Sequence, residues 1–241
     1  MRVALVTGAA GGIGSATVAR LLADGYAVVG LDLRTATIDE PARHAHVVGD
    51  IRERADLDTA VALAVERFGR LDAVVAAAAV IAGGRRLWET PVEELDALWD
   101  VDARGVWLTM TATIPAMLEG PDPSGCRFVG VASAAAHQGL FGLAGYNAAK
   151  HAVVGIVKGL AADLVGTGIT AAAVSPGSTR TPMLDDTAEL YGLPDPELFA
   201  AHQLLRRLLE PEEVAAAIAF CCSREAAVVT GSVVHADGGF S

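Results

Sequence analysis

Short valine-rich runs alternate along the whole chain with longer stretches in which alanine and leucine recur at helical spacing. Buried parallel strands are short apolar runs, and each parallel pair needs a crossover that is usually a helix. The alternation therefore predicts an α/β fold with helices on both faces of a parallel sheet. We predict strands at residues 3–7, 27–32, 46–50, 73–78, 127–133, 170–175 and 233–236. We predict helices at residues 13–24, 54–68, 92–118, 146–166 and 211–222.

The domain organisation follows from length and punctuation. A chain of 241 residues accommodates one large α/β domain and requires no second one, so we expect a single domain over residues 1–241. The stretch PGSTRTPMLDDTAELYGLPDPELFAAHQ is rich in proline and weakly periodic. An insertion of this kind between a strand and the last helix is a candidate lid, which we place at residues 178–208.

Charge and hydropathy narrow the class of protein. The net charge of −11 and the lack of a basic cluster argue against a nucleic-acid partner. The longest apolar run, residues 73–84, is too short to span a bilayer. We expect Cys126, Cys221 and Cys222 to be small buried residues, because they form neither a disulfide framework nor metal-ligand spacing, and we expect no metal site. The strand-like RVALVTG at the start leaves no room for a signal peptide, so we expect a cytoplasmic protein.

The glycine-rich stretch VTGAAGGIG follows the first predicted strand and begins the first predicted helix. Gly8, Gly12 and Gly14 allow a tight turn, a close approach of backbone to a diphosphate, and close packing of helix on strand. The N-terminus of the helix then presents free N–H groups to the anion. This context indicates a dinucleotide site.

Three polar residues after the next strands bear on the choice of dinucleotide. Asp32 lies 18 residues after Gly14, where a carboxylate accepts hydrogen bonds from an adenosine ribose and repels a 2′-phosphate. We therefore expect NAD rather than NADP, although Arg34 is close enough in sequence to serve such a phosphate. Asp50, which closes the third predicted strand, is either a contact to the adenine edge or a polar residue of a turn.

Tyr146 and Lys150 are four residues apart and so share one face of a predicted helix. Only Lys150 and Lys158 are lysines among 18 basic residues, so position 150 requires a compact ammonium that arginine does not supply. A phenol loses its proton at about pH 10, and a nearby ammonium favours the phenolate. Tyr146 is therefore a candidate general base for an alcohol, or general acid for a ketone. Ser133 ends a predicted strand at the carboxyl edge of the sheet, where its hydroxyl can hold the reacting oxygen.

These motifs together resemble the classical short-chain dehydrogenase/reductase family over the whole chain. Residues 7–14 match TGxxxGIG, the set Ser133, Tyr146 and Lys150 matches Ser…YxxxK, and SPGSTRTPM matches the PGxxxT segment. The resemblance implies a single-domain, Rossmann-like, doubly wound sheet and hydride transfer between NAD(P) and an alcohol or carbonyl carbon. It also implies a homotetramer built partly on the helices at 92–118 and 146–166.

The resemblance also implies which residues bind the cofactor. It implies that Pro176 and Gly177 lie beside the nicotinamide and that Thr181 lies near its carboxamide, while Lys150, from its chemistry, can hydrogen-bond a cofactor ribose. The full expected set is Gly8, Gly12, Ile13, Gly14, Asp32, Leu33, Asp50, Ile51, Ala77, Ala78, Tyr146, Lys150, Pro176, Gly177, Thr179 and Thr181.

Two departures from the family pattern stand out. Residues 76–79 are Ala-Ala-Ala-Ala where the family usually has Asn-Asn-Ala-Gly, and alanine tolerates positive φ less well than glycine. Asp102 stands where the family usually has the asparagine of its catalytic tetrad. Two alternatives are open for Asp102: a carboxylate near Lys150 that raises the pKa of Tyr146, or a side chain that points away and pairs with Arg104 or Arg86.

A finer similarity concerns two segments, AAAAVIAGGRRLWETP and WDVDARGVW. They are most similar to a subgroup associated with mycofactocin gene clusters. That similarity implies oxidation of an alcohol, with electrons passed from tightly held NADH to a peptide-derived redox carrier, mycofactocin.

The expected substrate follows from the residues around the motifs. Leu140, Phe141 and Leu143 should form one apolar wall of the pocket, with Met183 from the lid opposite. Further side chains that could close over it are Leu184, Tyr191, Phe199 and Leu205, and His137 and His202 are near the site in sequence order. Each of these side chains could equally be packed in the protein interior without touching the substrate. Together they favour an apolar alcohol or ketone without a phosphate.

Two other functions are weighed against this one. A non-catalytic NAD-binding regulator or scaffold on the same fold would be expected to have lost Ser133, Tyr146 or Lys150, and all three are present. A sugar-nucleotide epimerase or dehydratase needs a longer C-terminal substrate domain than 241 residues supply.

Overall fold

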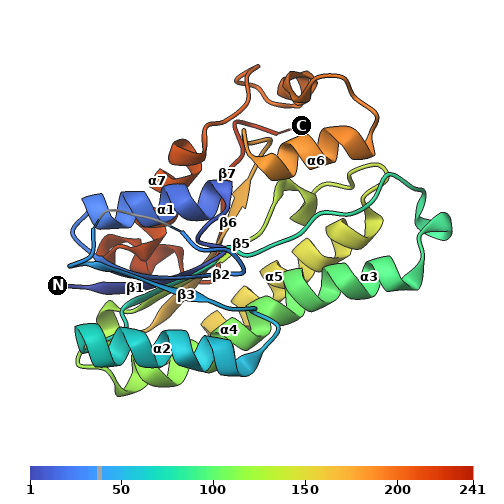
Figure 1. Ribbon diagram of the computed structural model, residues 1–241. Helices are drawn as coiled ribbons and strands as arrows, with labels where there is room; N and C mark the ends of the chain where they lie inside the picture. Colours follow the sequence, from blue (N-terminus) through green and yellow to red (C-terminus); the bar gives the residue numbers. More distant parts are fainter. Residues whose placement is uncertain (37–39, 241) are drawn as a thin grey trace.

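A parallel β-sheet forms the centre of the computed structural model, which describes residues 1–36 and 40–240 (Figure 1). Within these residues the sheet has seven strands in the order β3-β2-β1-β4-β5-β6-β7. The strands are β1 (Val3–Thr7), β2 (Ala27–Asp32), β3 (His44–Val48), β4 (Ala73–Ala76), β5 (Arg127–Val131), β6 (Thr170–Pro176) and β7 (Val233–Ala236). The predicted parallel α/β sheet is confirmed.

Helices connect the strands. The α-helices are α1 (Gly12–Ala23), α2 (Arg54–Phe68), α3 (Val92–Leu98), α4 (Gly105–Glu119), α5 (Ala144–Asp163), α6 (Pro182–Leu190) and α7 (Pro211–Cys222). A π-helical turn, η2 (Trp99–Arg104), joins α3 to α4. Short 3-10 turns are η1 (Leu87–Glu89), η3 (Pro123–Gly125), η4 (Ala134–Ala136), η5 (Pro196–His202) and η6 (Arg224–Val229).

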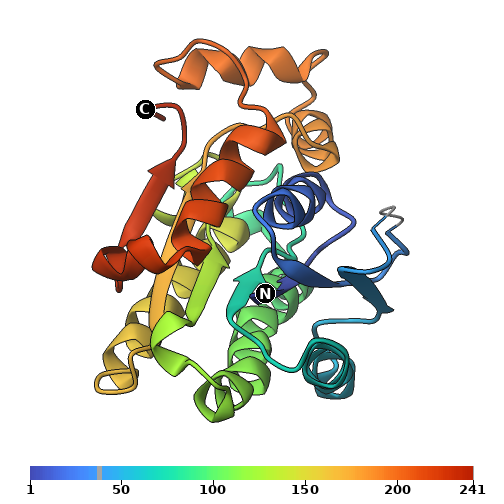
Figure 2. The same ribbon diagram turned by 90° about the vertical axis from the view of Figure 1, so that its left-hand side faces the viewer.

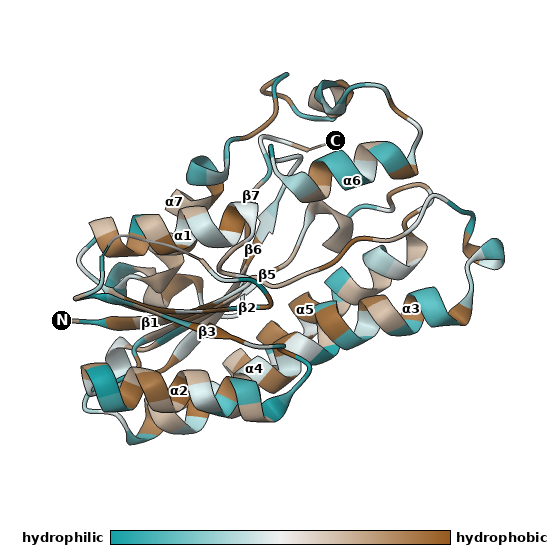
Figure 3. Ribbon diagram, viewed as in Figure 1, coloured by the Kyte–Doolittle hydropathy of each residue, from teal (hydrophilic) through white to brown (hydrophobic). Residues whose placement is uncertain are grey.

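The two faces of the sheet are covered by different helices. Successive strand residues point to opposite faces, so Val3 and Leu5 pack with α2, α4 and α5, whereas Ala4 and Val6 pack with α1 and α7. Figures 1 and 2 show these two helical layers on either side of the sheet. Because both faces are buried, the strands are almost continuously hydrophobic, as the brown centre of Figure 3 shows.

The strand order fixes where a ligand can bind. The chain runs outward from β1 to β3 and then returns to β4, which lies on the other side of β1. The loops after β1 and β4 therefore diverge, and such a switch point opens a crevice at the carboxyl ends of the strands. The glycine-rich stretch follows β1, and Ala77 and Ala78 follow β4.

Several predicted boundaries are wrong by a few residues. The third strand begins at His44 and ends at Val48, so Asp50 lies beyond it rather than closing it. Ser133 lies two residues beyond the end of β5, where it caps η4. The predicted helix at 92–118 is interrupted by η2, in which the N–H of Gly105 donates to the carbonyl of Asp100, five residues back.

Two expectations from composition concern the cysteines and membrane-spanning helices. Cys126, Cys221 and Cys222 are unpaired and buried, as predicted. Burial raises the pKa of Cys126 and Cys221 to about 11 and that of Cys222 to about 12, so none of them is a thiolate at neutral pH. No helix within residues 1–36 and 40–240 has both the length and the apolar character needed to cross a membrane.

Candidate active site

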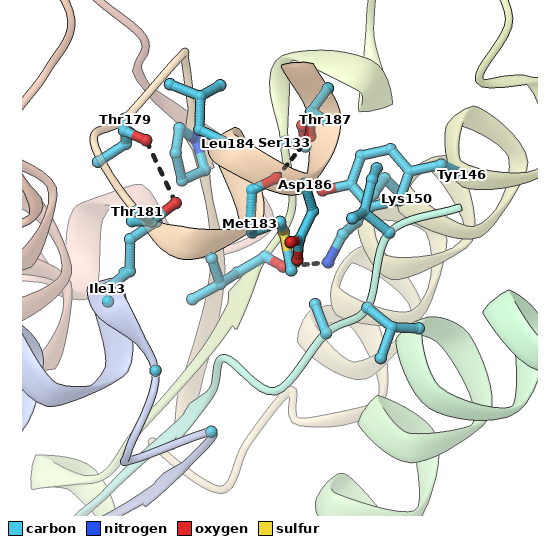
Figure 4. Close-up of a pocket in the computed structure, with 18 of the residues that line it drawn as sticks. Ile13, Ser133, Tyr146, Lys150, Thr179, Thr181, Met183, Leu184, Asp186 and Thr187 are labelled. Carbon is cyan, nitrogen blue, oxygen red and sulfur yellow. Dashed lines mark hydrogen bonds between the residues drawn. The ribbon is translucent and has the colours of Figure 1, made fainter. Parts of the chain in front are cut away.

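A pocket of about 1220 Å³ opens at the carboxyl ends of the strands (Figure 4). It is lined by the loops that follow β1 to β6, by the start of α5, and by α6 and η5. Every residue that we expected to bind the cofactor lines it, and so do Ser133 and the apolar residues Leu140, Phe141, Leu143 and Met183. Asp102 does not line the pocket; it is fully buried behind Lys150.

The glycine-rich loop makes a cradle that has no room for side chains. A Cβ on Gly14 would lie 1.9 Å from the carbonyl oxygen of Gly8, and one on Gly12 would lie 2.4 Å from Thr181 Cγ2. Gly8 has φ +68°, and its added Cβ would lie 2.7 Å from Ala78 Cα. Gly8 therefore lies directly against the backbone that follows β4, and Gly12 lies against the side chain of Thr181, which follows β6.

This cradle fits the diphosphate of a dinucleotide. The first N–H groups of a helix have no partner within it, and in α1 they begin at Gly12, with the side-chain-free Gly11 as N-cap. The first turn of α1 carries no acidic residue, so the positive end of the helix dipole remains available to an anion.

The loop after β2 places a carboxylate at the adenosine end of the pocket. The N–H groups of Ala10 and Arg34 donate to Asp32 Oδ2 and Oδ1, each at 3.0 Å. Arg34 donates to the carbonyl of Ala10, and its Nε lies 3.7 Å from Asp32 Oδ1. Asp32 is thus held in place by backbone N–H groups. The side chain of Arg34 lies beside its carboxylate and is largely exposed to solvent.

The neighbouring residues after β2 and β3 differ in exposure. Leu33 is largely exposed at the rim, whereas Ile51 is buried against Gly105. Asp50 forms an ion pair with Arg52, whose hydrogen bonds hold the pKa of that carboxyl below its usual range. Asp50 therefore lines the pocket and is also part of a turn, and the two readings of this residue do not exclude one another.

The run of alanines after β4 is accommodated without strain. Thr7 Oγ1 accepts hydrogen bonds from Ala77 N at 3.1 Å and Ala78 N at 3.3 Å. Among the described residues other than glycine, only Arg206 has a positive φ. Ala79 therefore adopts an ordinary backbone conformation. The difficulty anticipated for alanine in this segment does not arise.

Ser133, Tyr146 and Lys150 lie together at the centre of the pocket (Figure 4). Lys150 Nζ lies 5.5 Å from the centre of the Tyr146 ring and donates to the carbonyl of Val131 at 3.4 Å. Burial raises the pKa of Tyr146, the Lys150 ammonium lowers it, Asp102 raises it, and the Ser133 hydroxyl lowers it, with a net rise. The protein alone therefore keeps this phenol protonated, and the Lys150 ammonium and the Ser133 hydroxyl oppose the rise in its pKa.

Asp102 points toward Lys150, which decides between the two alternatives for it. Asp102 Oδ2 lies 3.4 Å from Lys150 Nζ, and Oδ1 accepts a hydrogen bond from Val80 N at 2.8 Å. The alternative in which Asp102 pairs with Arg104 or Arg86 is wrong, because η2 turns its side chain inward; Arg104 instead lies near Asp100.

The electrostatics of this buried pair are coupled. Burial raises the pKa of Asp102, and the attraction of Lys150 opposes that rise. Burial alone would lower the pKa of Lys150, but Asp102 and Tyr146 raise it above its usual value. Lys150 is thus held as an ammonium.

The candidate lid consists of two helical pieces, α6 and η5, over the pocket. The Tyr191 hydroxyl donates to the carbonyl of Phe141, which joins the lid to the segment that follows Ser133. The apolar side chains Leu184, Tyr191 and Phe199 line the pocket as anticipated. Leu205 does not: it is half-exposed and lies against the C-terminal turn, where its N–H donates to the carbonyl of Gly238.

Several lining residues were missed from the sequence. The polar ones include Asp186, Thr187 and Gln138, and Ile81 and Phe240 also contribute. Pro182 at the first position of α6 was an available signal, because a helix starting there places residues 183, 186 and 187 on one face. Of the two histidines considered, His202 lines the pocket and His137 does not.

Comparisons with known proteins identify the family of this chain. A family model described as enoyl-(acyl carrier protein) reductase matches residues 8–241. The chain is 35% identical over 257 residues to 2-(R)-hydroxypropyl-CoM dehydrogenase of Xanthobacter autotrophicus, covering 100% of this chain and 98% of that protein. The fold matches levodione reductase with a TM-score of 0.92 at 29% identity, covering 98% of this chain and 96% of that one.

A second solved structure includes a cofactor. The 3-ketoacyl-(acyl-carrier-protein) reductase from Brucella melitensis, solved with NADH, has a TM-score of 0.88 at 33% identity, with 99% of this chain and 97% of that chain covered. The family model and these full-length similarities agree with the motifs and with the sheet. The chain therefore belongs to the short-chain dehydrogenase/reductase family and is a nicotinamide-dependent oxidoreductase.

Proposed function

We propose that the protein transfers a hydride between NAD(H) and an apolar alcohol or ketone, with Tyr146 as general base or acid. The observation that carries this proposal is the meeting of Ser133, Tyr146 and Lys150 in the same pocket as the glycine cradle. A non-catalytic binding protein has no need for a buried phenol beside a buried ammonium, so that alternative is not favoured.

The residues divide the work on the substrate oxygen. The Ser133 hydroxyl donates to that oxygen and orients it toward the phenol. In oxidation, Tyr146 as phenolate removes the hydroxyl proton; in reduction, its phenol returns one. When bound, NAD⁺ would supply the hydride acceptor, and its positive ring would add to the forces that favour the phenolate.

Lys150 has two roles. An ammonium has three N–H donors. Two of them have a partner nearby, because the Val131 carbonyl oxygen and Asp102 Oδ2 each lie 3.4 Å from Lys150 Nζ. The remaining donor is available to a ribose hydroxyl of the cofactor. The charge of Lys150 lowers the pKa of Tyr146, whereas Asp102 raises it, so the pair sets the pH at which the base is active.

NAD is proposed as the preferred cofactor because of Asp32. Its carboxylate is fixed by two backbone N–H groups at the pocket edge, where a 2′-phosphate would meet a like charge. Arg34, a cation that could serve a phosphate there, is drawn toward that same carboxylate. Gly11 contributes no charge of its own.

The proposed substrate is apolar because the far end of the pocket is hydrophobic. Leu140, Phe141 and Leu143 form one wall, and Met183 and Phe199 from the lid face it. Asp186 lines the same region and disfavours an anionic group. A secondary alcohol with apolar substituents fits these surfaces.

The proposal is tested by following NADH formation with a panel of apolar secondary alcohols, then comparing NAD⁺ with NADP⁺. Turnover with none of the alcohols, together with none in the reverse direction with the matching ketones, would overturn it. Native mass spectrometry of the same sample tests two further parts: co-purifying NAD(H), as the mycofactocin-associated subgroup would require, and the homotetramer.

The groove between α4 and α5 supports the proposed assembly. It has a volume of about 580 Å³ and is lined by Trp107, Ile114, Gly155 and Gly159, among others. Trp107 is half-exposed, and an added Cβ on Gly155 or Gly159 would touch nothing in this chain. A helix pair of a second copy would cover these apolar surfaces.

A further inference from the structure

A cluster of two histidines and one carboxylate lies outside the catalytic pocket, beside the ends of β6 and β7. His137 follows η4, His235 is in β7, and Asp237 follows β7 directly. One potential ligand atom from each of the three lies within 4.8 Å of the other two. None of these residues lines the catalytic pocket.

The distances within the cluster are too long for hydrogen bonds. Asp237 Oδ2 lies 3.6 Å from His137 Nε2 and 3.5 Å from His235 Nδ1, whereas N–H···O hydrogen bonds span about 2.7–3.2 Å. Ligands at about 2.0–2.1 Å from a tetrahedral ion are separated from one another by about 3.3–3.4 Å. The two separations are therefore close to the edges of a metal-centred tetrahedron.

Surrounding groups orient the carboxylate toward the histidines. Asp237 Oδ1 accepts hydrogen bonds from the backbone N–H of Gly239 at 2.9 Å and of Phe240 at 3.3 Å. This leaves Oδ2 free to face both imidazoles, and Asp237 is nearly buried. A carboxylate fixed by one oxygen and free at the other is a common arrangement in metal sites.

One imidazole is oriented in the same way. The Oγ of the buried Ser175 lies 3.4 Å from His137 Nδ1, which leaves Nε2 to face Asp237. Metal-binding histidines usually have a hydrogen-bond partner on the nitrogen that does not bind the metal. The His137 and His235 rings meet edge to face, with 4.4 Å between their centres.

We propose that His137 Nε2, His235 Nδ1 and Asp237 Oδ2 bind one divalent transition-metal ion, with water in the fourth position. Imidazole with carboxylate suits Zn²⁺, Co²⁺ and Ni²⁺ rather than Mg²⁺ or Ca²⁺. His235 is half-exposed, so the ion has access from solvent. Bound there, the ion ties the segment after Ser133 to the end of β7. This proposal does not depend on the proposed reaction, and it departs from the sequence-based expectation of no metal site.

The test uses full-length protein without an affinity tag, stripped with a chelator and titrated with Co²⁺. Four-coordinate Co²⁺ absorbs visible light far more strongly than the aqueous ion, so absorbance reports the site directly. We expect one Co²⁺ per chain, displaced by Zn²⁺ with loss of colour, and a higher melting temperature in the presence of either ion.

Three variants decide whether these residues are the ligands. Asp237→Asn keeps the oxygen that accepts from Gly239 and Phe240 but replaces the free one, and His235→Gln changes a half-exposed side chain. Each should lower Co²⁺ affinity at least about tenfold. The matched control is His151→Gln, an exposed imidazole on α5, which should leave affinity unchanged.

The outcomes separate clearly. Loss of colour in both cluster variants with retention in His151→Gln supports the site. No coloured complex in the wild type, or full affinity in either cluster variant, overturns it. If Asp237→Asn does not fold, His235→Gln alone decides between the two outcomes.

Discussion

The carboxylate of Asp102 lies 3.4 Å from the ammonium of Lys150, and the two side chains are 0% and 2% exposed. The pair is separated by 48 positions in sequence, and η2 together with α5 brings it together. A buried charge is tolerated when it is paired, and removal of one partner leaves the other without compensation. Asp102 therefore belongs to the environment of the base even though it does not reach the pocket.

We expect Asp102→Asn to move the rising limb of the kcat/KM profile for alcohol oxidation to lower pH. Oxidation requires the phenolate of Tyr146, and the negative charge of Asp102 raises the pKa of that phenol. Removing this charge therefore lets the phenolate form at lower pH. The maximum rate should persist, because asparagine retains an oxygen for Val80 N. The matched control is Asp100→Asn, an exposed carboxylate in the same turn. Superimposable limbs for wild type and Asp102→Asn would show that the charge does not act on Tyr146.

Lys150→Met should lower the free energy of unfolding by about 3–5 kcal/mol, because Asp102 is left buried and unpaired. The double variant Asp102→Asn with Lys150→Met should regain part of that loss. Lys158→Met is the matched control; its side chain is exposed on the same helix, and a change there is worth about 0.5 kcal/mol or less. Chemical denaturation of the wild type, the single variants Asp102→Asn and Lys150→Met and the double variant measures the coupling, and strict additivity would argue against an ionised pair.

Tyr146→Phe should abolish turnover while NAD binding stays nearly intact, because only the ionisable oxygen is removed. Lys150→Arg should also be severely impaired, since a planar guanidinium does not replace the compact ammonium. The control Tyr26→Phe removes a phenol oxygen that bonds the Cys222 carbonyl, far from the pocket, and should retain activity. If Tyr146→Phe retains more than about a tenth of wild-type turnover, Tyr146 is not the base. Such a loss raises the activation free energy by less than about 1.4 kcal/mol.

The wild-type enzyme should prefer NAD to NADP by at least about tenfold in kcat/KM, equivalent to about 1.4 kcal/mol. Asp32→Asn should reduce this preference, because it removes the charge but keeps an acceptor for Ala10 N or Arg34 N. Steady-state kinetics with both cofactors give the ratio. Equal kinetics in the wild type would mean that Arg34 dominates the site, and Arg34→Gln would then restore discrimination.

Gly159→Ala tests the proposed assembly. In an isolated helix, alanine for glycine stabilises by about 0.5–1 kcal/mol, and nothing in this chain opposes the added methyl group. If helices of a second copy pack closely on the α4–α5 groove, the same methyl group should instead weaken the tetramer. Light scattering after serial dilution measures this; an intact tetramer of higher thermal stability would contradict close packing there.

The local sequence pattern was sufficient to place several strands and helices. Val3–Thr7, Ala27–Asp32 and Val233–Ala236 occur where the apolar runs indicated, as do the helices Arg54–Phe68 and Pro211–Cys222. The third strand pairs with β2 alone at the edge of the sheet and includes two histidines, His44 and His46, so the apolar run did not mark its start. Tertiary pairing, rather than propensity, sets that boundary.

The site was predictable where a motif specified it and less so where distant residues meet. The glycines of the glycine-rich loop line the same pocket as the Ser, Tyr and Lys set. The direction of Asp102 was open, because Arg104 and Arg86 are its neighbours in sequence whereas Lys150 is remote. The His137, His235 and Asp237 cluster gave no signal, since its members come from segments that only the folded sheet brings together.

The π turn at Trp99–Arg104 limits how this segment can change in length over evolution or by design. Each residue of an α-helix advances the chain by about 100° around its axis. Deleting a single residue there would rotate α3 relative to α4 by about that angle, and either Asp102 would leave Lys150 or the packing of α3 on α5 would be lost. An insertion has the same effect in the opposite sense. Alignments and chimeras of this chain should therefore treat residues 99–104 as a segment of fixed length, and recombination points belong in the exposed stretch before Val92.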